Sequence, residues 1–168
     1  ATYEKLVLNT KQNPRIHTFN VGMGQEKASL KININANSTI NSLLRPSESN
    51  QTEDIIIDTV SDFCTTQNIS TIDFMKTDTE GFDLSVLAGC SSLLEKQQLK
   101  VVMVECEPVS TNNYFVSMDD VATFFSPFGY KLFGIYEQQL DWNGDMSLLF
   151  FNAVFVCPDL VYNKLPAN

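Results

Sequence analysis

A short apolar run that ends in a cluster of charged residues constrains the fold of this chain more than any other feature of its sequence. Residues 72–76 read Ile-Asp-Phe-Met-Lys and lead directly into Thr-Asp-Thr-Glu-Gly at 77–81. The run has the length of a buried strand, and the apolar residues after it recur at helical spacing to about residue 97. A strand that brings carboxylates to the edge of a sheet is typical of α/β proteins, which bind their ligands there. The pattern therefore predicts an enzyme.

The remaining residues alternate between strand and helix patterns, which predicts a doubly wound α/β sheet that closes with a C-terminal β-hairpin. A chain of 168 residues suits one domain, 1–168, with a single core. In the N-terminal half the predicted elements are a helix at 3–13, strands at 16–21 and 28–34, a long loop at 35–54, a strand at 55–57 and a helix at 60–67 capped by Thr59 or Ser61. In the C-terminal half they are a strand at 101–104 buried on both faces, a helix at 117–128 with Ser117 as N-cap and Gly129 as its stop, and strands at 130–136 and 148–156 joined by a turn at 141–145.

Two acidic motifs follow neighbouring strands of this predicted sheet. Asp78 and Glu80 come after one strand, and Glu105 and Glu107 come after the next. Because ligands bind beyond the carboxyl ends of such strands, we expect these carboxylates to converge there. Their repulsion would raise the pKa of at least one of them unless Lys76 or a bound cation offsets it, and a carboxylate with a raised pKa is a usable general base. The same residue types also cap helices and stabilise first helical turns, which is the simpler, structural role.

Charge and cysteine usage exclude several classes of function. The net charge of −9 and a pI near 4.4 argue against a nucleic-acid partner, because such binding depends on clustered Lys and Arg. The longest apolar stretches have strand length and fall far short of the roughly 20 residues of a membrane helix, so no membrane span is expected. The 4 cysteines lie far apart without a CxxC pair, and there is 1 histidine, so no metal site is expected. Buried free thiols fit this pattern and favour a reducing, cytoplasmic compartment.

The segment 72–89 resembles the central signature of the FkbM-type methyltransferases. In that family a Lys-x-Asp-x-Glu-Gly stretch, here at 76–81, is followed by an acidic residue, Val-Leu and a small-Gly pair. Asp83 stands where the family often has Glu, so its side chain is one methylene shorter. Smaller pieces agree in order: Asn-Val-Gly-Met-Gly at 20–24 resembles the third strand and its turn, Asn-Ser-Leu at 41–43 the middle loop, and Val-Glu at 104–105 a strand that ends in Glu. The resemblance runs from about residue 3 to residue 108.

This resemblance implies a Rossmann-like class I methyltransferase sheet that binds S-adenosylmethionine and methylates a hydroxyl of a small molecule, sugar or lipid-like acceptor. The reaction is a direct displacement at a sulfonium methyl, so the protein mainly aligns donor and acceptor and provides a base for the hydroxyl proton. By the resemblance, Asp78 or Glu80 would be that base or would orient the acceptor, and Lys76 would set their charge. Glu105 and Glu107 would lie on the acceptor side.

The first part of the family pattern has no counterpart in this sequence. The family begins with a strand, a Gly-rich turn, a helix and a second strand that ends in Glu for the ribose, and none of these is present among the 168 residues. The missing strands would be central, so the sheet would be incomplete at its N-terminus and residues 16–21 would lack their usual neighbours. Val21, Gly22 and Met23 would remain on the adenine side of the cofactor. We expect that the chain alone does not bind S-adenosylmethionine measurably.

Two other functions fit the same residues. Four carboxylates at the ends of adjacent strands also suit a divalent-metal hydrolase, because hard cations prefer oxygen ligands. Alternatively, the chain is a non-catalytic binding or assembly module that self-associates through exposed sheet edges. Stabilisation by magnesium would favour the hydrolase, and a concentration-dependent dimer without a ligand response would favour the module.

Overall fold

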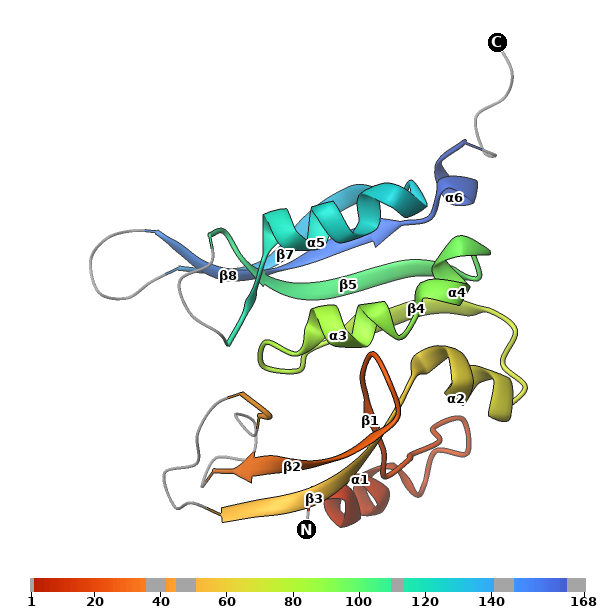
Figure 1. Cartoon of the computed structure of the whole chain (residues 1–168), viewed down its shortest axis with the longest axis vertical. Coiled ribbons are helices and arrows are strands. Elements are labelled where there is room, and N and C mark those ends of the chain that lie inside the picture. The colour runs from red at the N-terminus through yellow and green to blue at the C-terminus, as the bar shows by residue number, and fades with distance from the viewer. Residues whose placement is uncertain (1, 36–41, 45–50, 110–113, 141–146, 163–168) are drawn as a thin grey trace.

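The chain forms two β-sheets with short helices packed against them (Figure 1). The computed structural model describes residues 2–35, 42–44, 51–109, 114–140 and 147–162. The N-terminal elements are α1 (Thr2–Thr10), β1 (Gly22–Met23), β2 (Ala28–Ile34), β3 (Gln51–Asp58) and α2 (Val60–Thr66). The C-terminal elements are β4 (Ile72–Thr77), α3 (Asp83–Ala88), α4 (Ser91–Glu95), β5 (Leu99–Glu107), β6 (Val116–Ser117), α5 (Met118–Phe125), the 3-10 helix η2 (Ser126–Phe128), β7 (Lys131–Leu140), β8 (Leu148–Val156) and α6 (Pro158–Tyr162).

Both sheets are mixed, with parallel and antiparallel neighbours. The first has 3 strands in the order β1-β3-β2, and the second has 5, in the order β4-β5-β8-β7 with β6 beside β5. β4 and β5 are parallel and are connected through α3 and α4, which confirms the predicted strand–helix–strand unit. β8 is antiparallel to both β5 and β7, which confirms the C-terminal hairpin. The turn predicted at 141–145 lies outside the described residues.

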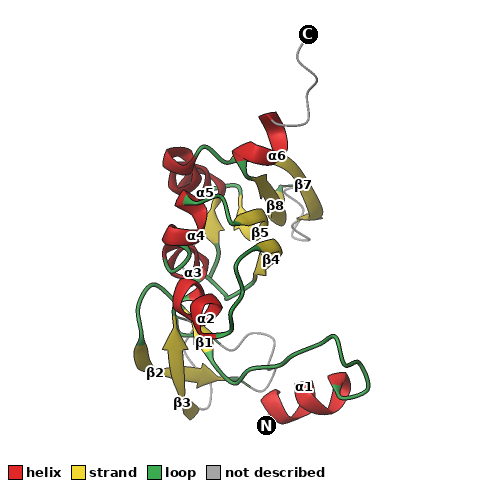
Figure 2. Cartoon of the chain, turned by 90° about the vertical axis from the view of Figure 1, so that its right-hand side faces the viewer, coloured by secondary structure: helices red, strands yellow, loops and turns green. Residues whose placement is uncertain are grey.

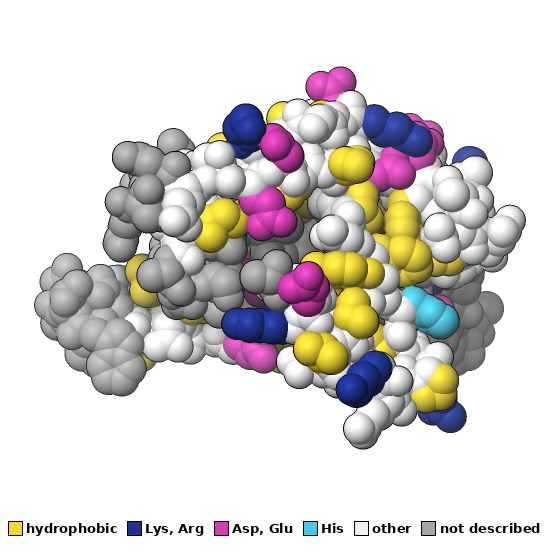
Figure 3. Space-filling view, turned by 90° about the horizontal axis from the view of Figure 1, so that it is seen from below, with side chains coloured by type: hydrophobic (Ala, Val, Ile, Leu, Met, Phe, Trp, Pro, Cys, Tyr) yellow, Lys and Arg dark blue, Asp and Glu magenta, His cyan; other side chains and the backbone are white. Residues whose placement is uncertain are grey.

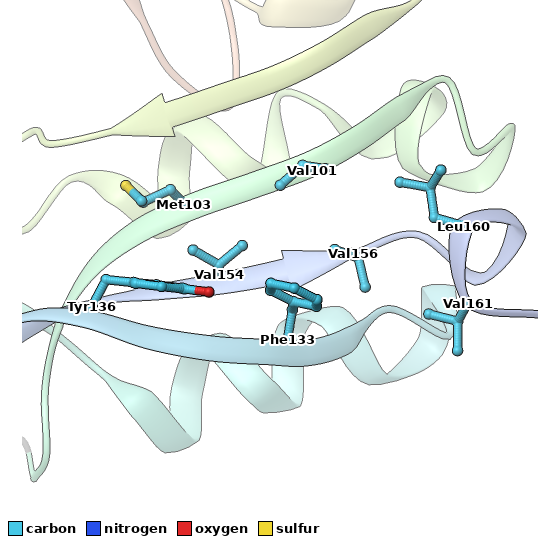
Figure 4. Close-up of a pocket in the computed structure, with 8 residues that line it drawn as sticks. All are labelled: Val101, Met103, Phe133, Tyr136, Val154, Val156, Leu160 and Val161. Carbon is cyan, nitrogen blue, oxygen red and sulfur yellow. The ribbon is translucent and has the colours of Figure 1, made fainter.

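The helices cover one face of the second sheet. α3, α4 and α5 lie on the same side of its strands (Figure 2). On that side Val102 and Val104 of β5 are fully buried together with Phe125 of α5. On the opposite face Val101 and Met103 line an open groove, which only α6 borders among the described helices (Figure 4). The strand at 101–104 is therefore not buried on both faces, and a doubly wound arrangement of the sheet stays a prediction.

The apolar run that begins at residue 72 forms an edge strand and not a buried one. β4 pairs with β5 alone among the described strands, and Phe74 is 54% exposed. The composition of the run is that of a buried strand, but its exposure depends on what lies along its second edge. The sequence pattern therefore predicted the strand correctly and its environment wrongly.

The N-terminal sheet differs from the prediction in two places. Residues 16–21 are not a strand, since β1 is limited to Gly22 and Met23, which pair with Ile57 and Asp58 of β3. The strand predicted at 55–57 is longer and begins at Gln51, because β3 pairs with β2 along the whole length of β2. The predicted strand at 28–34 is confirmed as β2.

The helix predicted from Gly81 to about residue 97 is broken in two. α3 ends before Gly89 and α4 begins after Cys90. The carbonyl oxygen of Gly89 accepts hydrogen bonds from the backbone nitrogen and Oγ of Ser61, at 3.1 and 2.8 Å. A Cβ at position 89 would also overlap the carbonyl oxygen of Gly24, so the first sheet packs directly on the backbone at this break. Contacts from the N-terminal half therefore end the helix at Gly89, although the apolar periodicity of the sequence predicts that the helix continues.

The other helix ends follow the sequence. The helix predicted at 3–13 is confirmed as α1, although it ends earlier, at Thr10. Thr59 caps α2 by accepting a hydrogen bond from the backbone nitrogen of Asp62 at 3.0 Å. Gly129 ends η2 in the left-handed conformation, with φ of 76°. A residue with a side chain would be strained there, which explains why the stop is a glycine.

Loss of the Ser117 cap is expected to cost about 1 kcal/mol of folding free energy. Ser117 Oγ accepts from the backbone nitrogen of Asp120 at 3.1 Å and donates to Asp120 Oδ2 at 2.7 Å. The variant Ser117→Ala removes both bonds at the N-terminus of α5, and urea denaturation measures the change. The control Ser126→Ala alters an exposed serine at the other end of the same helix and should change stability by less than about 0.5 kcal/mol.

The cysteines are confirmed as buried free thiols. All 4 are buried and unpaired. Burial raises the pKa of Cys90 and of Cys106 to about 12, so both remain protonated at neutral pH.

The surface around the first sheet carries charges of both signs. Viewed from that end, apolar side chains gather between scattered acidic and basic ones (Figure 3). The exposed apolar residues of the N-terminal segment include Leu6, Leu8 and Phe19. None of the described helices has the length and apolar character needed to cross a membrane.

Candidate functional site at the carboxyl ends of β4 and β5

An ion pair marks the end of β4. Lys76 Nζ lies 2.8 Å from Asp78 Oδ2, and both side chains are partly exposed. The hydrogen bond to Asp78 raises the pKa of Lys76 above its ordinary value, so the ammonium stays charged at neutral pH. Lys76 thus neutralises one carboxylate of the predicted cluster.

The turn after β4 folds back sharply. Glu80 and Gly81 both have positive φ, 52° and 93°. Ser42 Oγ donates a hydrogen bond to the carbonyl oxygen of Glu80 at 3.1 Å, so the loop around residue 42 contacts this turn. Positive φ is uncommon for a residue with a side chain, and the surrounding contacts must hold it. The Lys-x-Asp-x-Glu-Gly motif therefore forms a rigid turn between β4 and α3.

Asp83 lies beneath this turn and not at the surface. It is 2% exposed, at the first residue of α3. Burial raises the pKa of its carboxyl group, and the nearby hydroxyls of Thr77 and Thr79 oppose that shift. From this buried position Asp83 can support the turn. Its side chain is one methylene shorter than the Glu that the family often has here, which fits the confined space.

Glu105 has a strongly raised pKa. Burial raises its pKa to about 7, and repulsion from Asp78, Glu80 and Asp83 adds to that rise while Lys76 opposes it. The pKa of one of the predicted carboxylates, Glu105, is raised, but burial is the largest cause and the predicted repulsion between carboxylates is a smaller one. A carboxyl group with a pKa near 7 can both accept and release a proton at neutral pH.

The second acidic motif lies within β5 and not after it. β5 extends to Glu107, so Glu105 and Glu107 are strand residues on the same face. Glu107 is 2% exposed, where it pairs in register with Ser117 of β6. The strand is longer than predicted because it pairs with β8 as far as Cys106.

The residues expected on the cofactor side lie against α3. Gly22 and Met23 form β1, and the turn after them packs on the helix, where the backbone nitrogen of Gln25 donates to Ser85 Oγ at 3.1 Å. The space beside Gly22 and Gly24 is filled by the side chain of Ile57, so these glycines allow close packing and do not form an open cradle. Val21 is half-buried just before β1.

Two residues of the C-terminal hairpin join this cluster, and sequence reasoning missed both. Glu137 of β7 contributes to the raised pKa of Lys76. Asn152 of β8 donates a hydrogen bond from Nδ2 to Glu137 Oε2 at 2.5 Å and is itself 2% exposed. One sequence signal could have identified Asn152, since it is the single polar residue in the apolar run Leu-Leu-Phe-Phe-Asn-Ala-Val-Phe-Val. No short-range sequence pattern links Asn152 to Lys76, because the two residues lie far apart in the chain.

The geometry gives no support to the metal-hydrolase alternative. Within the described residues, no three or more His, Cys, Asp or Glu side chains are close enough to share a metal ion. The carboxylates of this cluster interact over a longer range through their charges. A divalent cation needs several oxygen ligands within about 2–2.6 Å of one point.

Comparison with known families identifies the type of domain. A family model described as the methyltransferase FkbM domain matches residues 2–132, which is well over half of the chain. No curated protein and no solved structure matches the sequence. The match includes the rigid turn after β4 and the strand that carries Glu105, whereas Glu137 and Asn152 lie beyond it. The chain therefore belongs to the FkbM methyltransferase family.

Proposed function

We propose that the chain is the acceptor-binding part of an S-adenosylmethionine-dependent O-methyltransferase. The observation that carries this proposal is the meeting of Lys76, Asp78 and Glu105 at the carboxyl ends of two parallel strands, inside the segment that the family model matches. Ligands of α/β sheets bind at that edge. The parallel β4 and β5, joined through helices, support a Rossmann-like class I arrangement.

In this proposal Glu105 is the general base. Its pKa of about 7 suits proton transfer at neutral pH better than that of an ordinary carboxylate. Asp78, which the family resemblance offers as the base, is bound to Lys76 and is better placed to orient the acceptor hydroxyl. Glu80 lies in the turn that follows Asp78, where its backbone has a positive φ. Lys76 offsets part of the negative charge, which keeps Glu105 ionisable.

The donor would supply an electrophilic methyl group, and the residues present do not form a complete site for it. The packed glycines of the β1 turn leave no cradle for a cofactor. β1 and β4 are both edge strands in the described residues, and the strands that the family pattern places between them would pair there. We infer that donor binding requires the Gly-rich segment that is absent from this sequence.

Calorimetric titration with S-adenosylmethionine tests this assignment. The 168-residue chain is expected to give no measurable binding, whereas a longer polypeptide that includes a Gly-rich segment should be stabilised by S-adenosylhomocysteine. At 100 times the dissociation constant the stabilisation is about 2.7 kcal/mol. Micromolar binding to the chain alone would show that its β1 region is a sufficient donor site and would contradict the inference. Failure of the longer polypeptide to respond would contradict the methyltransferase proposal itself.

A further inference from the structure

The turn at Glu80 and Gly81 has a backbone conformation that its own sequence only partly favours. Its φ angles of 52° and 93°, with a hydrogen bond from the backbone nitrogen of Phe82 to the carbonyl oxygen of Thr79 at 3.3 Å, are those of a type I′ turn. Both central residues of such a turn need positive φ, so Asn, Asp and Gly are preferred there. Gly81 meets this preference and Glu80 does not. Contacts from outside the turn must therefore hold Glu80 in place.

One such contact comes from the loop that leaves the first sheet. Ser42 Oγ donates a hydrogen bond to the carbonyl oxygen of Glu80 at 3.1 Å, across 38 positions of the chain. Ser42 is 1% exposed, so bulk water does not compete for this bond. A hydrogen bond in a place closed to water is electrostatically stronger than one at the surface. The bond therefore acts directly on the residue whose conformation is unfavoured.

The Ser42 hydroxyl is itself fixed in position. The backbone nitrogen of Leu44 donates to Ser42 Oγ at 3.0 Å, so the hydroxyl accepts one hydrogen bond while it donates another. The carbonyl oxygen of Ser42 accepts from the backbone nitrogen of Asn33 in β2, also at 3.0 Å. β2 in turn pairs with β3 along its whole length. The contact to the turn is therefore anchored in the first sheet.

The conformation of the turn also determines where Asp78 lies. Residues 78–82 alone connect β4 to α3, and both ends of this connection are packed. Thr77 is paired with β5 in register, and Asp83 is 2% exposed. Because both ends are fixed, a change of φ at Glu80 has to be taken up by the residues between them, which include Asp78.

We propose that Ser42 is a positioning residue of the candidate site, whose hydroxyl holds Glu80 at positive φ and thereby places the Asp78 carboxylate at the end of β4 beside Lys76. The catalytic meaning of this role rests on the proposed methyltransferase function, in which Asp78 orients the acceptor hydroxyl. Ser42 adds a contribution from the first sheet to a site otherwise built from the second.

NMR spectroscopy of the 168-residue chain and its variant Ser42→Ala tests the effect on the turn. A residue at positive φ has its amide and α protons unusually close together, so Glu80 should show a strong nuclear Overhauser effect between them in the parent chain. In Ser42→Ala this signal should weaken severalfold, because Glu80 relaxes to the negative φ that residues with a side chain prefer. An equally strong signal in the variant would overturn the proposal.

A second readout follows the carboxylate itself. Asp78→Asn should lower the pKa of Glu105 in the parent chain, because the Asp78 charge helps to raise it. In the Ser42→Ala background the same substitution should lower this pKa less than about half as much, because a carboxylate that is no longer held is screened by solvent. Equal shifts in the two backgrounds, measured from the carboxyl carbon of Glu105, would show that Ser42 contributes stability only and would overturn the positioning role.

The variant Glu80→Asn separates the holding of the turn from other effects of Ser42. Asn followed by Gly is the preferred pair of a type I′ turn, so this turn no longer needs the bond from Ser42. In the Glu80→Asn background, Ser42→Ala should leave the signal at position 80 strong and the effect of Asp78→Asn on Glu105 unchanged. Losses as large as those in the parent background would overturn the proposal.

Ser91→Ala is the matched control. Ser91 Oγ donates to the backbone carbonyl oxygen of Ala88 at 2.7 Å, so this variant loses a bond of the same type at the far end of α3. It should leave both readouts unchanged, and changes equal to those of Ser42→Ala would show general loosening and overturn the proposal. If Ser42→Ala does not fold, Ser42→Cys, which keeps a similar size but only a weak donor, should weaken the signal of Glu80. An unchanged signal in that variant would overturn the proposal too.

In a polypeptide that binds the donor, Ser42→Ala should lower kcat by up to about 10²-fold, the cost of a small misplacement of a positioning group. The affinity for S-adenosylmethionine should stay unchanged, and a fall in that affinity with unchanged kcat would overturn the role on the acceptor side. The two NMR readouts need no donor. A failed donor titration would therefore remove the methyltransferase function, whereas unchanged NMR readouts would remove the role of Ser42.

Discussion

Replacing Glu105 with Gln is expected to stabilise the chain by about 1–2 kcal/mol at pH 8 and to have almost no effect near pH 4.5. The pKa of the Glu105 carboxyl group rises from an ordinary 4.5 to about 7 in the folded chain. Between these pH values the folded state therefore binds the proton more tightly than the unfolded state. The stability from Glu105 is therefore fully present below pH 4.5 and is lost as pH rises through 7. The shift corresponds to about 3 kcal/mol for a fully buried group, and solvent screening of this half-buried side chain reduces that figure.

Urea denaturation at several pH values measures this effect as the difference between the variant and the parent chain. Glu53→Gln, at an exposed position of β3, is the matched control and should change stability by less than about 0.5 kcal/mol at any pH. A difference for Glu105→Gln that does not grow between pH 5 and pH 8 would contradict the environment described for Glu105.

The same variant tests the proposed base in a polypeptide that binds the donor. Gln cannot accept the hydroxyl proton, so kcat should fall by roughly 10²–10⁴-fold. The affinity for S-adenosylmethionine should stay unchanged, because Glu105 lies on the acceptor side of the site. A fall in donor affinity with unchanged kcat would assign Glu105 to donor binding instead.

Replacing Gly89 with Ala is expected to destabilise the chain by about 2–4 kcal/mol. Local propensity predicts the opposite sign, because Gly89 has a helical conformation, with φ of −67°, and Ala there would restrict the unfolded chain. The added Cβ, however, would overlap the backbone carbonyl oxygen of Gly24, and a backbone atom cannot rotate away as a side chain can. The turn after β1 and α3 would have to separate.

Gly22→Ala is the matched control for this prediction. Its Cβ would approach Ile57 Cδ1, the far end of a flexible side chain, at 2.6 Å. A change of rotamer can relieve that contact, so the cost should stay below about 1 kcal/mol. Chemical denaturation of both variants measures the contrast. Equal stability of the Gly89 variant and the parent chain would show that the first sheet does not pack on α3 through backbone contact.

The predictions that held depend on residues close together in the chain. The turn after β4 is encoded by a strand pattern followed at once by Glu80-Gly81, and the caps at Thr59 and Ser117 need only the next few residues. The pairing of β7 with β8 follows from two apolar runs with a short connection. Each of these features depends on residues that are neighbours in the sequence or are joined by a short connection, so a local pattern suffices to predict it.

The predictions that failed depend on distant contacts. The periodicity of 82–97 continues through Gly89, but Ser61 and Gly24 occupy that helix end and break it. Residues 72–76 have the composition of a buried strand, yet burial of β4 depends on a second neighbour that the described chain does not provide. An apolar run shows that a segment can be buried, and only the surrounding elements show whether it is.

The sequence by itself determined that this is a mixed α/β domain of the FkbM family with Lys76, Asp78 and Glu105 at one edge of a sheet. Motif spacing carries that information, because strand ends bring these side chains together whatever covers the sheet. Only the tertiary structure decided which face of the sheet is bare and that Asn152 and Glu137 join the site. The reason is that β8 inserts between β5 and β7, and this long-range pairing places Asn152 beside Glu105.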